Sequence, residues 1–226
     1  MCGRITSKVT PQDLQELFDV IRFDDSIAWA PRYNVAPTTE VICVKSARDG
    51  REAFAARWGL IPSWAKDLKL AASTFNARSD TVATKPMFRS AFKARRCLVI
   101  ASGFYEWKKL DAKNKQPYYI TRTNGQPMAM AGLHEWWKSP EGTEIVSCTI
   151  CTTESNEMMS ELHDRMPVIL TDDQIAPWLD TSIKDVPAVE TLLTQFPSDE
   201  MQFWAVSKEV GNVRNQGEEL MEAIPE

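Results

Sequence analysis

The amino-acid sequence predicts an α+β fold built on a largely antiparallel sheet. Short segments rich in β-branched and aromatic residues dominate residues 39–152. Strands and helices do not alternate through this region, as they would in a parallel α/β sheet. With 226 residues, the chain is long enough for one large domain or two small ones, and for a substantial core.

The first elements are a helix and a loop. Thr10 and Pro11 predict a capped helix with proline at its first position, and Leu14 begins its apolar stripe. Proline and asparagine in residues 32–37 predict a loop, either an ordinary connector or one that presents arginine and asparagine donors to a phosphate or base.

Two strands follow, at residues 39–45 and 53–58, joined by a turn at residues 48–50. The loop after them carries two indole rings, Trp58 and Trp64. Such rings can stack on bases or wedge between them, or they can both lie in the core.

The middle of the chain carries three side chains of chemical interest. Asn76 and Arg78 are two residues apart, so they share one face of an extended strand. A helix is predicted at residues 86–96, and a buried strand at residues 97–101 then runs to the aromatic segment around Glu106. An acid at a strand end among aromatic residues is a candidate for proton transfer, since desolvation raises a carboxyl pKa. A surface glutamate is the alternative.

The second half begins with a predicted hairpin. Strands at residues 117–122 and 127–132 flank Asn124 and Gly125, a strong two-residue turn signal. The remaining predicted elements are a strand at 144–152, a helix cap at 152–155, a short helix at 156–161, a loop at 162–167, helices near 172–180 and 186–195, a strand near 201–206, and a closing polar loop at 211–215.

The composition is that of an ordinary soluble globular protein, with 43% hydrophobic and 25% charged residues. No apolar run approaches the length of about 18 residues that a membrane span needs. A polar stretch, and no apolar signal-peptide core, follows the first residues. We therefore expect a cytoplasmic protein that does not associate with membranes.

The five cysteines do not form a disulfide framework, because they are odd in number and widely spaced. Cys148 and Cys151 form a CxxC pair within a predicted strand, where residues three apart point to opposite faces. This placement argues against a metal or redox site. Cys43 and Cys97 lie in apolar segments and are interpreted as small core residues.

The net charge of −5 hides a strong asymmetry. Residues 57–96 hold nine Lys and Arg against two acids, whereas residues 141–226 hold four against eighteen. The basic segment also contains the aromatic residues Trp58, Trp64, Phe75, Phe88 and Phe92. This composition is typical of a groove that follows phosphates and stacks bases, but a solvated basic helix with core aromatics has it too.

The first residues offer a distinct chemistry. Removal of Met1 would leave Cys2 with its α-amine and thiol on adjacent carbon atoms. The amine of such a 1,2-aminothiol adds to an aldehyde to give an imine, and the sulfur then closes on the imine carbon to form a thiazolidine. His163, in a polar loop, is a better acid–base candidate than His134, which lies in an aromatic segment and is interpreted as structural.

Seven ordered motifs carry a family resemblance. They are Met1-Cys2-Gly3-Arg4, Arg32-Tyr33-Asn34-Val35-Ala36-Pro37, Trp58-Gly59-Leu60-Ile61-Pro62, Asn76-Ala77-Arg78, Gly103-Phe104-Tyr105-Glu106-Trp107, His163-Asp164-Arg165-Met166-Pro167 and Gly211-Asn212-Val213-Arg214-Asn215. Together they resemble the SOS response-associated peptidase (SRAP) family over nearly the whole chain. The resemblance implies a single domain, residues 1–226, with a barrel-like β core flanked by short helices.

The resemblance also implies a function. Such a protein removes its own Met1, recognises abasic sites in single-stranded DNA during the DNA damage response, and crosslinks to them through an imine intermediate. On this sequence, Cys2 is the nucleophile, Asn76 orients the amine or the opened sugar, Glu106 shuttles protons, and His163 assists ring opening. We expect a monomer without metal or cofactor, associated with the bacterial nucleoid when bound to DNA.

The implied DNA contacts are Arg4, Asn34, Arg78 and Arg165 at phosphates, with Trp64 or Trp107 beside the lesion. Nearby arginines are also expected to favour the Cys2 thiolate. Two alternatives stay open. One is an N-terminal-nucleophile hydrolase acting on peptides or amides, and the other is a DNA-binding module in which Cys2 has no chemical role.

Overall fold

The computed structural model describes residues 2–225. Its strands are β1 (Ile5–Ser7), β2 (Val20–Phe23), β3 (Arg32–Val35), β4 (Glu40–Ala47), β5 (Gly50–Trp58), β6 (Asn76–Arg78), β7 (Arg96–Ala101), β8 (Gly103–Lys109), β9 (Lys115–Arg122), β10 (Met128–Lys138), β11 (Glu144–Glu154), β12 (Arg165–Pro167) and β13 (Met201–Ala205). Its α-helices are α1 (Pro11–Phe18), α2 (Arg89–Ala94), α3 (Glu157–Ser160), α4 (Asp172–Leu179) and α5 (Val186–Glu190). None of the helices in the described part is long and apolar enough to cross a membrane.

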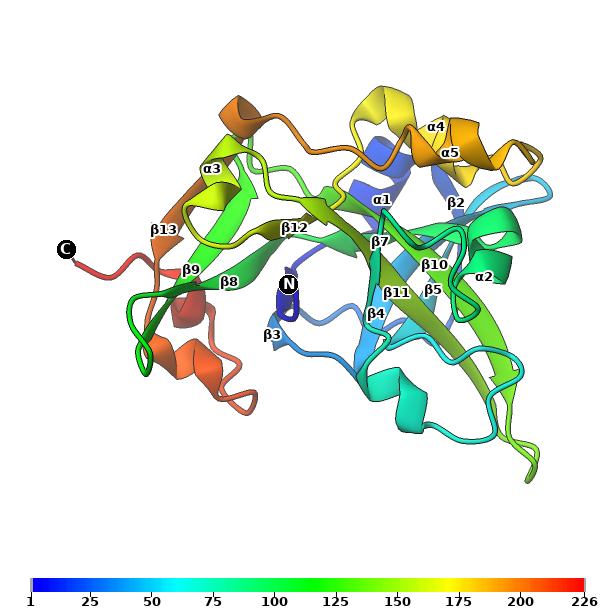
Figure 1. Ribbon diagram of the computed structural model, residues 1–226, viewed down its shortest axis with the longest axis horizontal. Coiled ribbons are helices and arrows are strands. Elements are labelled where there is room, and N and C mark those ends of the chain that lie inside the picture. The colour runs from blue at the N-terminus through cyan, green and yellow to red at the C-terminus, as the bar shows by residue number, and fades with distance from the viewer. Residues whose placement is uncertain (1, 226) are drawn as a thin grey trace.

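Five strands close into a barrel. The order is β11-β10-β7-β4-β5, with antiparallel neighbours, and β5 returns to β11 in a parallel pairing at Arg57↔Ser147 and Trp58↔Cys148. Strands β2, β6 and β12 extend this sheet, and short helices lie along its outside (Figure 1). The predicted fold class, a largely antiparallel, barrel-like α+β domain with flanking short helices, is confirmed.

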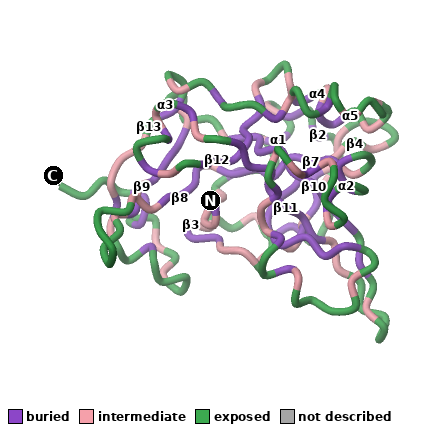
Figure 2. Tube along the Cα trace, in the orientation of Figure 1, coloured by how far each residue is buried: buried purple, intermediate pink, exposed green. Residues whose placement is uncertain are grey.

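A second, antiparallel sheet lies beside the barrel, in the order β13-β9-β8-β1-β3. Residues 2–4 lie between the barrel and this sheet (Figure 1). The segments around them are largely buried (Figure 2). Ile5 fixes the position of β1, since it is fully buried and pairs with Val35 on one side and Phe104 on the other. The amide of Tyr105 donates to the Arg4 carbonyl oxygen at 2.9 Å, so residues 2–4 run toward Glu106.

Local signals predicted several elements correctly. Thr10 caps α1 in a reciprocal capping box with Asp13. Strands β4 and β5 are joined at Gly50, whose φ of +139° suits glycine. The two CxxC cysteines lie on opposite faces of β11, Cys148 in the core cluster around Cys2 and Cys151 in the other large cluster.

The predicted hairpin at Asn124-Gly125 is wrong. Strand β9 pairs with β8 and β13, whereas β10 pairs with β7 and β11 in the other sheet. Gly125 does adopt a positive φ of 71° in a turn. The chain uses this turn to cross between sheets, because each strand has longer pairing partners elsewhere.

Other boundaries differ for the same reason. Residues 32–35 form β3 and not a loop, because they pair with β1. Helix α2 is shorter than predicted and ends before Arg96, which pairs with Leu133 in the barrel. Glu106 lies inside β8 and not at a strand end. The cap of α3 is Asn156, whose side chain accepts from Met159 N.

Much of the basic segment is structural. Arg96 is 1% exposed, and its guanidinium donates to the carbonyl oxygens of Trp178 and Asp180. Arg95 pairs with Glu135 at 2.7 Å. Phe88 and Phe92 are buried in the core. The two phenylalanine rings lie in the core, as the alternative to a DNA groove expected, but Arg96 is buried in a strand and does not lie on a solvated helix.

Candidate functional site

Cys2 lies at the junction of the barrel and the second sheet. The residue is 0% exposed, and its carbonyl oxygen accepts a hydrogen bond of 2.6 Å from the Asn76 Nδ2 amide. Asn76 is held on β6 by parallel pairing with Ile150 of β11. The Oδ1 atom of the same amide is buried and has no hydrogen-bond partner within residues 2–225. The Asn76 side chain that binds Cys2 therefore also carries a hydrogen-bond acceptor, Oδ1, that no donor in the described residues uses.

Glu106 provides the second polar group near Cys2. It is 5% exposed, and its Oε1 accepts from Trp107 N at 3.1 Å. Burial, and then the charge of Glu106, raise the pKa of the Cys2 thiol to about 12. The expectation that arginines would favour the thiolate is therefore wrong: desolvation and a neighbouring acid keep the sulfur protonated.

Arg4 and Asn34 tie the C-terminal segment to this site. Arg4 Nη1 donates to Asn34 Oδ1 at 2.5 Å and to the Val210 carbonyl at 2.6 Å. Its Cζ lies 5.6 Å from the centre of the Trp107 ring, within cation–π range. Burial lowers the Arg4 pKa from its usual value. Arg4 therefore has a structural role whether or not it also meets DNA.

Asn34 is hydrogen-bonded to the C-terminal loop. It is 2% exposed, and its Nδ2 lies within hydrogen-bond distance of the carbonyl oxygens of Val210, Asn212 and Asn215, at 3.2, 3.0 and 2.9 Å. Asn34 therefore anchors the C-terminal loop, and its role as a DNA contact stays a prediction. The physical reason is that folding brings residue 34 against backbone acceptors more than 170 residues away.

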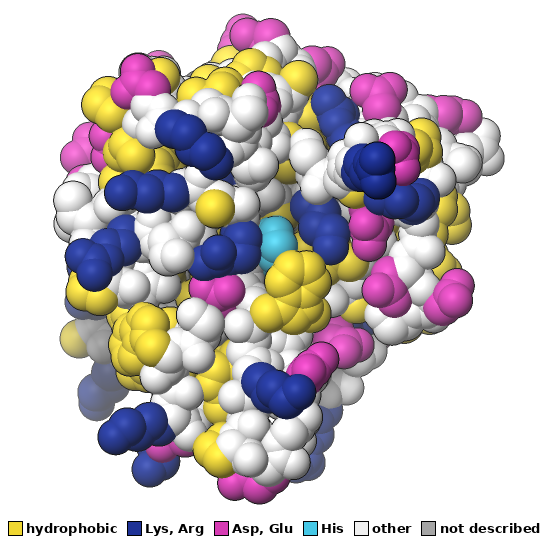
Figure 3. Space-filling view, turned by 90° about the vertical axis from the view of Figure 1, so that its right-hand side faces the viewer, with side chains coloured by type: hydrophobic (Ala, Val, Ile, Leu, Met, Phe, Trp, Pro, Cys, Tyr) yellow, Lys and Arg dark blue, Asp and Glu magenta, His cyan; other side chains and the backbone are white. Residues whose placement is uncertain are grey.

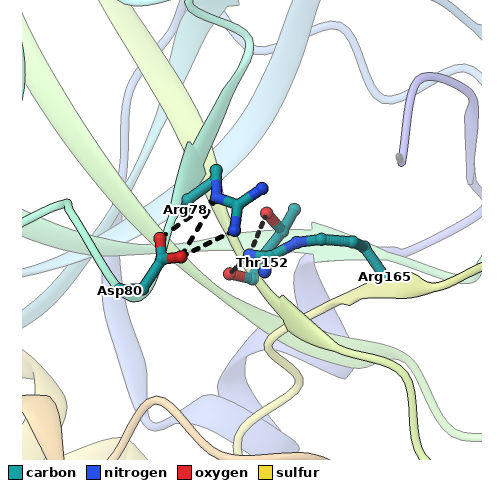
Figure 4. Close-up of polar contacts among 4 residues, drawn as sticks. All are labelled: Arg78, Asp80, Thr152 and Arg165. Atoms are coloured by element: carbon teal, nitrogen blue, oxygen red, sulfur yellow. Dashed lines mark hydrogen bonds and ion pairs between the residues drawn. The ribbon is translucent and has the colours of Figure 1, made fainter.

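Arg78 and Arg165 lie together beside β11 (Figure 4). Arg78 is exposed, and its Nε and Nη2 form a fork on Asp80, with an Nη2–Oδ2 distance of 2.6 Å. Arg165 is 7% exposed and donates from Nη2 to the Thr152 carbonyl at 2.5 Å and to its hydroxyl at 3.2 Å. Its Nε has no partner in the described part, and burial and the nearby Arg78 lower its pKa. Two guanidiniums this close form a site suited to an anion.

His163 lines a surface pocket together with Arg78, Glu154, Ser155, Ser160, Leu162, Asp164 and Arg165. The face turned toward the viewer in Figure 3 carries Lys and Arg side chains interspersed with acidic and hydrophobic ones. The imidazole Nδ1 accepts from Arg165 N at 3.0 Å and lies 2.7 Å from Asp164 Oδ1. The pocket thus combines cationic side chains with a group able to transfer protons.

The two indoles of the loop after β5 have different environments. Trp58 is 0% exposed and its Nε1 donates to the Phe75 carbonyl at 2.8 Å, so it is a core residue. Trp64 is 58% exposed. An exposed large aromatic side chain is available for stacking, and Trp64 stays a predicted DNA contact. Trp107 is half-buried beneath Arg4.

Sequence reasoning missed Asp80 and Thr152, which orient the two arginines, and Asp164, which contacts His163. The spacing of Arg78 and Asp80 was a usable signal, because a carboxylate two residues away can reach back to a guanidinium. The sequence gave no such signal for Thr152, since its contact with Arg165 depends on the pairing of β11 with β12.

His134, the other of the two histidines in the sequence, is a structural residue. It is 5% exposed, and burial, with Lys45 and Arg95 nearby, lowers its pKa to about 3. An unfolded chain binds this proton below a pKa of about 6.5. Stability from His134 is therefore present above pH 6.5 and is lost as the pH falls from there toward 3.

We expect His134→Phe to flatten this pH dependence. Between pH 7 and 5, the parent should lose up to about 2 kcal/mol of unfolding free energy more than the variant. Urea unfolding at the two pH values measures the difference. Equal losses in both proteins would contradict the assignment of His134 as the group responsible.

The arrangement defines a class of protein. It has a mixed β-barrel with a flanking sheet, and Cys2 lies near the start of the chain beside the Asn76 amide and the Glu106 carboxylate. The sequence matches the family described as SOS response associated peptidase (SRAP) over residues 1–213. The chain belongs to this family.

Curated relatives match over almost the whole chain. Abasic site processing protein YoqW of Bacillus subtilis is 40% identical, covering 99% of this chain and 100% of that protein. Abasic site processing protein HMCES of Xenopus tropicalis is 35% identical, with 99% and 78% covered. A crystal structure of a Bacteroides thetaiotaomicron protein shares the fold, with a TM-score of 0.86 at 23% identity, covering 99% and 100% of the two chains.

Proposed function

We propose that this protein recognises abasic sites in single-stranded DNA and forms a covalent crosslink to them through Cys2, after its own removal of Met1. The observation that carries the proposal is the position of Cys2, held by Asn76 and adjacent to Glu106, at the junction of the two sheets. Met1 lies outside the described residues. The names of the relatives support abasic-site processing as the general activity.

The chemistry proceeds in balanced steps. Hydrolysis of the Met1–Cys2 peptide bond consumes one water and exposes the α-amine. An abasic deoxyribose exists partly as an open-chain aldehyde, and addition of the amine followed by loss of water gives an imine. The thiol then adds across the C=N bond, sulfur bonding to carbon and a proton reaching nitrogen. The product is a thiazolidine.

The high pKa of the thiol indicates the order of these steps. A free α-amine has a pKa of about 8, so part of it is unprotonated at neutral pH. In the chain that still carries Met1, burial and Glu106 raise the pKa of the Cys2 thiol to about 12, which favours attack by the amine before the sulfur. Glu106 then accepts the thiol proton as sulfur adds. The Oδ1 of Asn76, which has no partner in the described part of the chain, would accept a hydrogen bond from the amine in this scheme.

The DNA strand would be held by side chains outside this centre. Arg78 and Arg165 offer donors for a phosphate, and the exposed ring of Trp64 can stack on a base or fill the space left by the missing one. Single-stranded DNA fits such contacts because its bases are free to unstack. One protomer contains every group invoked, so we propose that a monomer acts on each lesion.

A crosslinking reaction tests the proposal. We expect purified protein, shown by intact mass to lack Met1, to give a heat-stable band of higher mass with single-stranded DNA that carries one abasic site. The same strand without the lesion serves as the control. No adduct from protein that lacks Met1 would refute the proposal. Turnover of peptides without DNA would favour the alternative, a hydrolase.

A further inference from the structure

The imidazole of His163 has an unusual pair of neighbours at one nitrogen. The backbone N–H of Arg165 points at Nδ1 from 3.0 Å, and the Asp164 carboxylate oxygen Oδ1 lies 2.7 Å from the same atom. One neighbour is a hydrogen-bond donor and the other is an acceptor. A ring nitrogen normally needs only one of the two, according to whether it carries a proton.

Each protonation state of the ring uses a different neighbour. In the neutral ring, Nδ1 accepts from the Arg165 amide, which places the remaining proton on Nε2. In the charged ring, the new Nδ1–H donates to Asp164, and its positive charge lies beside the carboxylate. Nδ1 can therefore gain or lose a proton without losing its hydrogen bond.

We propose that Asp164 is a positioning residue for His163, stabilising the protonated imidazole while the Arg165 amide holds the neutral one. This role rests on the proposed function and on the predicted part of His163 in ring opening, in which the imidazole would give a proton to the sugar ring oxygen and later take one back. A histidine with a partner in both states can do this without turning its ring. Asp164 itself touches neither DNA nor Cys2 in this scheme.

Other charges line the same pocket and bear on the titration. They are Arg78 from β6, Glu154 from β11 and Arg165 from β12. Arg78 is forked on Asp80, and Arg165 is tied to Thr152, so both cations are fixed by other partners. Among these charges, Asp164 is the one in direct contact with Nδ1. Glu154→Gln is therefore a matched control, removing a carboxylate from the same pocket.

The chain offers a clean spectroscopic test, because it contains two histidines and the pKa of His134 is about 3. His134 is therefore neutral between pH 5 and 9, and any imidazole ¹⁵N signal that changes in this range belongs to His163. We expect ¹⁵N NMR of the full-length protein without DNA to show a neutral ring protonated at Nε2. In Asp164→Asn, the titration midpoint should fall by about 0.2–0.7 pH units, the size typical of an exposed ion pair. Asp164→Glu should restore most of the shift, and Glu154→Gln should move it less.

Three results would overturn the assignment. They are an unchanged titration midpoint in Asp164→Asn, a neutral His163 ring protonated at Nδ1, and an equal midpoint shift in Glu154→Gln. Crosslinking supplies a second readout, since the acid side of the pH–rate profile should move with the NMR midpoint. A parent protein that forms no adduct would refute the proposed function while leaving the NMR result standing. Adduct formation with no NMR shift would refute the role of Asp164 alone.

Discussion

Cys2→Ser is expected to convert a durable adduct into a reducible one. The variant keeps the α-amine, so it should still form an imine with the aldehyde of an abasic site. It lacks the sulfur, and the imine should reverse in water instead of closing to a thiazolidine. We expect the heat-stable band to fall to background, and borohydride reduction before heating to restore it.

Two controls make this result specific. Cys151→Ser removes a thiol from the other core cluster and should leave the durable adduct intact. Intact-mass analysis must show that Met1 is absent from Cys2→Ser, because a blocked amine would abolish both products. An adduct from Cys2→Ser that survives heat without reduction would exclude ring closure by sulfur.

Glu106→Gln is expected to change two rates in opposite directions. The neutral amide cannot take the thiol proton, so crosslinking should slow by about 100-fold, within the usual range for a lost general base. The charge of Glu106 raises the pKa of Cys2, so its loss should lower that pKa and speed alkylation of the thiol at pH 8. Single-turnover crosslinking and haloacetamide labelling measure the two rates.

Damage to the fold would also expose the buried Cys2 thiol and speed its alkylation. The urea unfolding midpoint of Glu106→Gln must therefore match that of the parent before the two rates are compared. Glu154→Gln, in the neighbouring pocket, should leave both rates close to the parent values. A Glu106→Gln protein that crosslinks at the parent rate would remove Glu106 from the mechanism.

Local sequence patterns determined most of the elements. Capping residues located α1, and β-branched segments located β4, β5, β7 and β11, because these signals act over a few residues. The alternation of side chains along a strand correctly placed Cys148 and Cys151 on opposite faces. The local patterns did not predict which strands pair with each other. The Asn124-Gly125 turn shows the reason, because the same local geometry occurs in a hairpin and in a crossing between two sheets.

The sequence by itself determined the fold class, the family and the residue types of the site. Only the tertiary structure decided which of them share an environment. It placed Asn76 on the Cys2 carbonyl, turned Asn34 into an anchor for the C-terminal loop, and buried the Cys2 sulfur until its pKa rose to about 12. These outcomes depend on burial and on contacts between distant residues, and neither desolvation nor a long-range hydrogen bond is encoded in any short stretch of chain.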